Sequence, residues 1–288
     1  MAARDLTIGI VELVGGECLE RCLAAVSTME ADCVVTQRAT SPFTTELQSR
    51  FPNVQFMVHS KKSVPERRGD IVKASQSPYV ALIEDTTIPA PGWARAAVEK
   101  LQNHGAVSGP VSIDPKLGAR FIALACSEFH RFVPNAARNT EYPWFAGNHF
   151  AARRSDMSEL VLAESRLIET DLIERLRDAG DTIYFGEECS GEYIAEDHKN
   201  AASASRFHHG RLYAGRQKLP LLRRWRLALR CLLLPLVLSY RASTAVPTLS
   251  LSKKLRVLIW IFWFETAWSS GECSGYLFGE SNAACHWN

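Results

Sequence analysis

The sequence lacks the features that define several classes of protein. Its eight cysteines include no CxxC pair, which argues against a disulfide framework or a zinc ribbon and favours reduced thiols. It has no internal repeat, and 17 glycines and 13 prolines among 288 residues are too few for a collagen-like or low-complexity chain. With 47% hydrophobic residues it is predicted to be globular, and its length allows one large domain or one domain with an appendage.

Acidic residues are absent from a long C-terminal stretch. Between His198 and Phe264 there are thirteen Lys or Arg residues and no Asp or Glu, whereas the remainder holds 20 basic and 31 acidic residues. The chain therefore divides into an acidic body and a basic tail. In the tail the basic residues are interleaved with aliphatic runs rather than with stacking aromatics, which favours an anionic membrane surface as partner and argues against nucleic acid.

The tail also lacks an apolar run long enough to span a membrane. Its runs at 227–240 and 255–268 are interrupted by charged residues or proline, and neither reaches the roughly 18 to 20 residues that a span requires. No signal peptide precedes the first predicted strand. We therefore expect a cytoplasmic body whose tail lies at the cytoplasmic side of the cell membrane, peripheral or shallowly inserted, as interfacial helices or a short re-entrant hairpin. Alternatively, three tail tryptophans form a buried interface: Trp260, Trp263 and Trp268.

Strands and helices are predicted to alternate through the first 100 residues. This alternation is typical of βαβ units, a parallel sheet and right-handed crossovers. Apolar runs predict buried strands at 6–13, 33–36, 54–58 and 79–83, with helices of about ten residues between them. In the less regular region that follows, strands are predicted at 106–113, 145–152, 182–185 and 192–195, and helices at 117–133, 155–163 and 170–179.

Two acidic residues end the strand at 79–83. Glu84 and Asp85 precede a Pro-x-Pro-Gly-Trp turn at 89–93 that leads into a helix. In open α/β sheets ligands bind beyond the carboxyl ends of the strands, so carboxylates at this point are candidates for a binding site. Without that context, paired acids after a strand are more often solvated turn residues.

The segment 64–93 resembles the family 2 glycosyltransferases of the GT-A fold, which place an Arg and a Gly before a helix, then a strand, an acidic metal motif and Pro-x-Pro-Gly-Trp. The segments 147–155, 169–176 and 194–211 continue the resemblance in order to about residue 216. The resemblance implies a GT-A mixed α/β sheet with flanking helices over 1–216, followed by a basic, apolar and helical region over 217–288.

The resemblance also implies roles for individual residues. Glu169 would be the general base, and Arg67, Glu84 and Asp85 would bind the donor nucleotide. Mn²⁺ or Mg²⁺ would be held by Glu84 and Asp85, with help from His198. Four residues would lie on the acceptor side: Trp93, Asn148, His149 and Asp171.

Each assignment has a structural alternative. Glu169 and Asp171 also suit a helix N-terminus, which favours acidic side chains. Trp93 can pack beneath the site as core, and Asn148 and His149 can shape a loop without touching substrate. Since Arg67 and Arg68 are adjacent, one of them can be a solvated charge, and His198 can be a surface residue.

The implied activity is transfer of a sugar from a nucleotide-sugar donor to a saccharide or lipid-linked acceptor, with inversion, in cell-surface polysaccharide or glycolipid synthesis. The sequence departs from the family pattern at Thr86, at the 10–16 loop and at 36–40, which touch the metal and nucleotide in the family. Two alternatives stay open. One is a catalytically degenerate GT-A protein that serves as a membrane-associated assembly partner. The other is a sugar nucleotidyltransferase, although a Gly-rich phosphate loop with a nearby Lys is absent near the N-terminus.

Overall fold

The computed structural model describes residues 5–41, 44–134, 140–195 and 201–286, and the chain forms two compact units. The first unit comprises 1–112 and 132–195, and the second comprises 113–131 and 196–288. The division differs from the boundary predicted at residue 216, because the helices at 119–129 and 201–215 both belong to the second unit.

The first unit is built on a mixed sheet of eight strands within the described residues, in the order β3-β2-β1-β4-β9-β6-β10-β8. The β3-β2-β1-β4 half is parallel, and β9 runs antiparallel between β4 and β6. The strands are β1 (Leu6–Val11), β2 (Asp32–Arg38), β3 (Val54–His59), β4 (Tyr79–Glu84), β6 (Ala106–Ser108), β8 (Thr140–Glu141), β9 (His149–Arg153) and β10 (Ile183–Phe185).

The strand predicted over 106–113 is two strands in different sheets. β6 ends at Ser108, and β7 (Val111–Ile113) joins β5 (Thr87–Pro89) and β11 (Gly191–Tyr193) in a second sheet. Pro110 between them has no backbone N–H to donate. A side chain at Gly109 would overlap the backbone of Cys189, so the chain turns where another segment passes close by.

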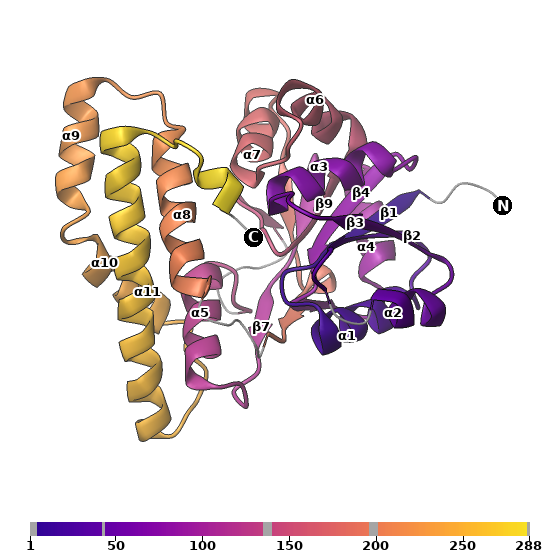
Figure 1. The fold of residues 1–288 in the computed structure, drawn as a ribbon, viewed down its shortest axis with the longest axis horizontal. Coiled ribbons are helices and arrows are strands. Elements are labelled where there is room, and N and C mark those ends of the chain that lie inside the picture. Colours follow the sequence, from indigo (N-terminus) through magenta and orange to yellow (C-terminus); the bar gives the residue numbers. More distant parts are fainter. Residues whose placement is uncertain (1–4, 42–43, 135–139, 196–200, 287–288) are drawn as a thin grey trace. The chain divides into compact units, whose positions relative to one another are not determined.

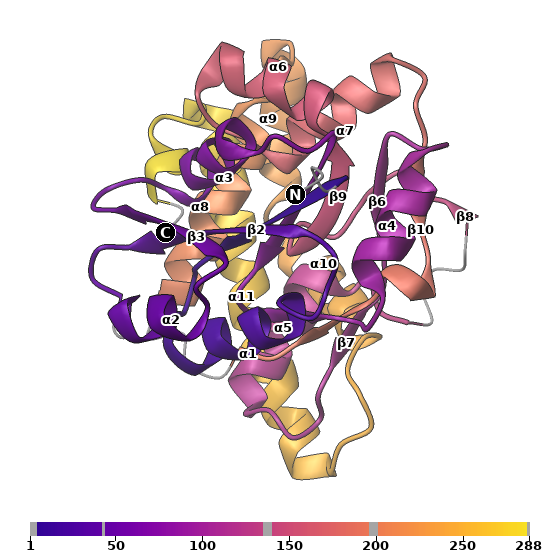
Figure 2. The same ribbon diagram turned by 90° about the vertical axis from the view of Figure 1, so that its right-hand side faces the viewer.

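Helices cover both faces of the large sheet, and the alternation of β1 explains why (Figures 1 and 2). Leu6, Ile8 and Ile10 lie in one core cluster with residues of α1 (Gly16–Val26), α2 (Thr44–Arg50) and α4 (Trp93–Leu101). On the opposite face α3 (Val64–Ala74) approaches β1 so closely that a Cβ at Gly9 would overlap Ile71. Two further helices of this unit are α6 (Arg154–Glu164) and α7 (Glu169–Asp178).

The second unit is helical. α11 (Leu251–Phe278) contacts α5 (Ala119–Phe129), α8 (Ala201–Gly215), α9 (Leu221–Arg230) and α10 (Leu234–Ser243), and α8 runs alongside it (Figure 1). Glycines bring α8 and α11 together, because a Cβ at Gly271 would overlap the Phe207 carbonyl oxygen and one at Gly275 would overlap that of Arg211. The close crossing explains why α8 belongs with the tail helices.

A buried ion pair also ties α8 to α11. Arg206 Nη2 lies 3.1 Å from a carboxylate oxygen of Glu265, and both residues are at most 5% exposed. The guanidinium also sits 4.6 Å from the centre of the Trp268 ring. Because a buried charge needs a partner, this pair favours the observed contact between the two helices. Among the described helices, none combines the length and the apolar character needed to cross a lipid bilayer.

We predict that Gly271→Ala lowers the free energy of unfolding by about 1–3 kcal/mol, since the new methyl group pushes apart backbones in contact. The exposed neighbour Ser270 on the same helix is the control, and Ser270→Ala should change stability by no more than about 0.5 kcal/mol. Urea unfolding of both variants provides the measurement. Equal stability of the two variants would contradict the close crossing.

Candidate active site

Helix α3 places two arginines at the carboxyl end of the parallel strands. Ser63 and Glu66 form a capping box at its start, with the Ser63 N–H and hydroxyl donating to Glu66 Oε2 at 2.9 and 2.7 Å. The helix is buried along most of its length. Both Arg67 and Arg68 are therefore enclosed, at 0% and 1% exposure, so neither is the solvated charge that adjacency in the sequence allowed.

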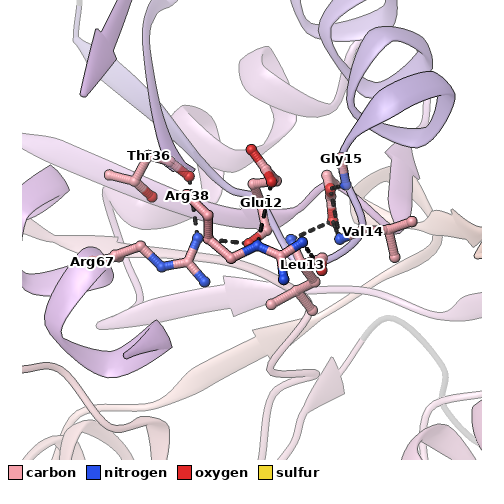
Figure 3. Close-up of polar contacts among 8 residues, drawn as sticks. Glu12, Leu13, Val14, Gly15, Thr36, Arg38 and Arg67 are labelled. Carbon is pink, nitrogen blue, oxygen red and sulfur yellow. Dashed lines mark hydrogen bonds and ion pairs between the residues drawn. The ribbon is translucent and has the colours of Figure 1, made fainter. Parts of the chain in front are cut away.

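Arg67 points to the ends of β1 and β2 (Figure 3). Its Nη1 donates to the Glu12 carbonyl oxygen at 2.6 Å and to the Thr36 carbonyl oxygen at 3.3 Å. Its Nε and Nη2 have no hydrogen-bond partner within the described part of the chain. Burial lowers the Arg67 pKa to about 10, with partial compensation by Glu12, so the guanidinium stays charged at neutral pH.

Arg68 lies between two carboxylates from different elements. Its Nη2 donates to Glu84 Oε1 and to the Gly147 carbonyl oxygen, each at 3.0 Å, and its Nη1 forms an ion pair with Glu169 Oε1. The side chains of Glu84 and Glu169 are 12% and 16% exposed. One guanidinium thus joins the end of β4 to the first turn of α7.

Asp85 has a different role from its neighbour Glu84. It is fully buried, and its carboxylate accepts hydrogen bonds from the backbone N–H groups of Leu13, Val14 and Gly15 at distances from 2.6 to 3.3 Å. Burial raises the Asp85 pKa to about 6, although these hydrogen bonds work in the opposite direction. Asp85 therefore holds the loop that follows β1 through these three backbone N–H groups.

The expected metal site at Glu84, Asp85 and His198 does not fit the described residues. The Asp85 carboxylate accepts backbone N–H groups and the Glu84 carboxylate is ion-paired with Arg68, so both already have partners within the protein. No group of three or more His, Cys, Asp or Glu side chains able to hold a metal occurs in the described ranges. His198 itself lies outside the described residues.

The residues predicted on the acceptor side take structural positions. Trp93 is fully buried in the core and donates its indole N–H to the Cys189 carbonyl oxygen at 2.9 Å. Asn148 is 1% exposed and donates from Nδ2 to Thr87 Oγ1 at 2.8 Å. Both side chains are therefore buried and hydrogen-bonded to other segments of the first unit.

His149 and Asp171 complete the predicted acceptor set. The His149 ring is fully buried, with Nε2 3.1 Å from the Cys189 carbonyl oxygen, and burial lowers its pKa to about 4. His149 is therefore neutral at pH 7, and its ring contacts the backbone at Cys189. Asp171 lies in the first turn of α7, two residues after Glu169. At this position a carboxylate interacts favourably with the helix dipole.

Sequence reasoning missed two charged residues of the site. Arg68 was not assigned a role, although its position one residue after Arg67 turns it about 100° around the helix, toward a different set of partners. Arg38 was also overlooked. At the end of β2 it donates from Nη2 to the Leu13 carbonyl oxygen at 3.0 Å, and its Nε lies 3.4 Å from Glu12 Oε1 (Figure 3).

The mixed sheet with flanking helices is that of the GT-A glycosyltransferase fold. The chain is similar to the crystal structure of GalNAc-T7 with UDP, GalNAc and Mn²⁺, with a TM-score of 0.51 and 11% sequence identity. The match covers 76% of this chain and 52% of that chain, so this protein spans about half the length of the structure it matches. No family model and no curated protein matches the chain.

We predict that Asp85→Ala lowers the free energy of unfolding by about 2 kcal/mol or more, since three backbone N–H groups lose their acceptor. A metal ligand at the rim of the sheet would leave the stability nearly unchanged. The exposed Asp32 at the start of β2 is the control, and Asp32→Ala should cost no more than about 0.5 kcal/mol. Denaturant titration of the metal-free protein distinguishes the two roles.

Proposed function

We propose that this protein is a glycosyltransferase that moves a sugar from a nucleotide-sugar donor to a saccharide or lipid-linked acceptor. The observation that carries the proposal is the placement of Glu169, at the start of α7, beside Arg68 and Glu84 at the carboxyl end of β4 in a GT-A fold. The donor class is suggested by GalNAc-T7, which was crystallised with UDP and GalNAc.

Glu169 is the general base in this proposal. Its carboxylate takes the proton of the acceptor hydroxyl as that oxygen attacks the anomeric carbon, and the bond to the nucleoside diphosphate breaks with its electron pair leaving on the diphosphate. The attack occurs opposite the leaving group, so the configuration inverts. The ion pair with Arg68 orients Glu169 through Oε1, and the side chain keeps 16% exposure toward an acceptor.

Arg67 supports donor binding. Two of its N–H-bearing nitrogens are buried without a hydrogen-bond partner in the described residues, although such groups are rarely left unsatisfied in native proteins. A guanidinium that is charged at neutral pH, at the ends of β1 and β2, suits a nucleotide or its diphosphate. The segments 10–16 and 36–40, which differ from the pattern of the resembled family, are compatible with this role. Asp85 accepts a hydrogen bond from Gly15 in the first segment, and Arg38 in the second donates to the Leu13 carbonyl oxygen.

We predict that Glu169→Gln reduces sugar transfer by about 10²-fold or more while nucleotide binding persists. A panel of UDP-, GDP-, ADP- and dTDP-sugars, screened first by thermal shift, supplies the donor for the assay. Glu174, exposed on the same helix, is the matched control, and Glu174→Gln should keep normal turnover. Normal turnover per folded molecule in Glu169→Gln, combined with lower thermal stability, would instead assign Glu169 to helix capping.

The panel also separates the rival functions. A degenerate GT-A partner protein would hydrolyse and transfer none of the nucleotide-sugars. A sugar nucleotidyltransferase would form a nucleotide-sugar from a sugar phosphate and a nucleoside triphosphate, with release of pyrophosphate. Only release of a nucleoside diphosphate together with glycosylation of an acceptor supports the proposal.

We further propose that the second unit attaches the enzyme to the cytoplasmic face of an anionic membrane, in cell-surface polysaccharide or glycolipid synthesis. Large apolar side chains are exposed at helical spacing along α9, at Leu222, Trp225 and Leu229. The same helix exposes Arg223 and Arg226. Exposed apolar residues continue in α10 and α11, at Leu236, Val237, Tyr240, Leu251, Leu255, Ile259, Phe262 and Trp263.

This combination suits an interfacial position, because apolar side chains bury at the headgroup boundary while each nearby Arg or Lys adds about 1 kcal/mol on an anionic leaflet. We predict that the full chain sediments with vesicles containing phosphatidylglycerol and is released by high salt. The variant Leu222→Ser/Trp225→Ser/Leu229→Ser should lose this binding. Leu162→Ser, which changes an 82% exposed leucine on α6, should retain it. Sedimentation of the triple variant at the wild-type level would contradict membrane docking through α9.

A further inference from the structure

The guanidinium of Arg68 occupies the position between the donor-side and acceptor-side carboxylates. Its two terminal nitrogens contact Glu84 and Glu169, and Nη2 also reaches the Gly147 carbonyl oxygen at 3.0 Å. These three groups come from the end of β4, the start of α7 and the loop before β9. All of them are oxygen ligands of the kind that Mg²⁺ or Mn²⁺ prefers.

The Arg68 guanidinium therefore already contacts the three oxygen-bearing groups that a divalent metal would use as ligands. The planar fork of a guanidinium can hold two carboxylates at once. Arg68 is 1% exposed, so removing its carboxylate partners would leave an uncompensated buried charge. Asp85 offers no substitute, because its carboxylate accepts three backbone N–H groups.

We propose that Arg68 is a fixed internal cation that takes the place of a divalent metal between Glu84 and Glu169, so that donor binding requires no metal. This inference rests on the proposed glycosyl transfer. Arg68 positions Glu169 and neutralises part of the charge of the two carboxylates. Arg67, on the other side of α3, supplies positive charge to the donor through nitrogens that are not engaged in the described structure.

The first test uses the full chain and Mn²⁺ alone, without nucleotide. Free Mn²⁺ is measured by electron paramagnetic resonance during titration of wild type, Arg68→Gln and Arg67→Gln. Wild type should leave Mn²⁺ free. Arg68→Gln releases two carboxylates and one carbonyl oxygen, so its affinity for Mn²⁺ should rise by about tenfold or more.

Arg67→Gln is the matched control, because it makes the same change at an equally buried arginine one residue away that contacts carbonyl oxygens instead of carboxylates. It should leave Mn²⁺ as free as wild type does. Adding Glu84→Gln to Arg68→Gln should abolish the new Mn²⁺ binding. A folded Arg68→Gln protein that binds no more Mn²⁺ than wild type would overturn the proposal.

If Arg68→Gln does not fold, Mn²⁺ titration of the wild-type chain and of Glu84→Gln still tests the proposal. Wild-type chain that binds one Mn²⁺ and loses it on Glu84→Gln contradicts the proposal, whereas wild-type chain that leaves Mn²⁺ free supports it. A second titration measures binding of UDP, GDP and ADP in EDTA and in MnCl₂. Equal affinity in both solutions supports metal-independent binding, and affinity that is lost in EDTA overturns it.

Failure of the proposed function gives a different result. If none of the three nucleotides binds in either solution, the glycosyltransferase proposal loses its donor, while the Mn²⁺ titrations without nucleotide still report whether Arg68 occupies the cation position.

Discussion

The candidate site depends on burial of a permanently charged guanidinium. Helix α3 lies against Gly9 of β1, where no side chain intervenes, and this close packing forces Arg68 into the interior. A buried arginine is stable only with charged and hydrogen-bonding partners. Glu84, Glu169 and the Gly147 carbonyl oxygen meet that requirement, and in doing so they fix three separate segments of the first unit around one point.

A buried carboxylate is accommodated differently on the other face of the sheet. The Asp85 carboxylate accepts hydrogen bonds from backbone N–H groups of the 13–15 loop instead of pairing with Arg68. The loop consequently has a defined shape even though it lacks the residue pattern of the resembled family. Two neighbouring acids thus have different roles: Glu84 forms an ion pair with Arg68, and Asp85 orders the backbone of the 13–15 loop.

Much of the fold was predictable, because apolar runs separated by helices specify a parallel sheet. The predicted strands at 54–58 and 79–83 agree with β3 and β4 to within one residue at each end. The split of 106–113 into β6 and β7 was missed because the approach of Cys189 to Gly109 is a tertiary contact. The extent of the helical unit was missed for the same reason, since the fit between glycines of α11 and the backbone of α8 leaves no periodic signal.

The contacts among the candidate site residues were predictable only in part. The apolar run before Glu84-Asp85 indicated that both acids follow a buried strand, and β4 does end at Glu84. Successive residues of a strand point to opposite faces, so only one of the two acids could meet α3, and the pattern alone did not say which. Likewise, the sequence did not indicate whether Arg67 or Arg68 contacts the carboxylates, because this depends on which side of α3 faces Glu84 and Glu169. The rings of Trp93 and His149 both contact the carbonyl oxygen of Cys189, which is distant in sequence from them.

The discontinuous make-up of the helical unit has a consequence for biosynthesis. α5 is synthesised in the middle of the chain, but its contacts α10 and α11 follow more than a hundred residues later. Domains generally fold as their segments leave the ribosome, in N-to-C order. Here the apolar side of α5, with Ile122, Ala125 and Phe129, must wait for the last part of the chain. A ribosome that stalls before residue 251 therefore leaves a product in which α5 lacks its contacts with α11.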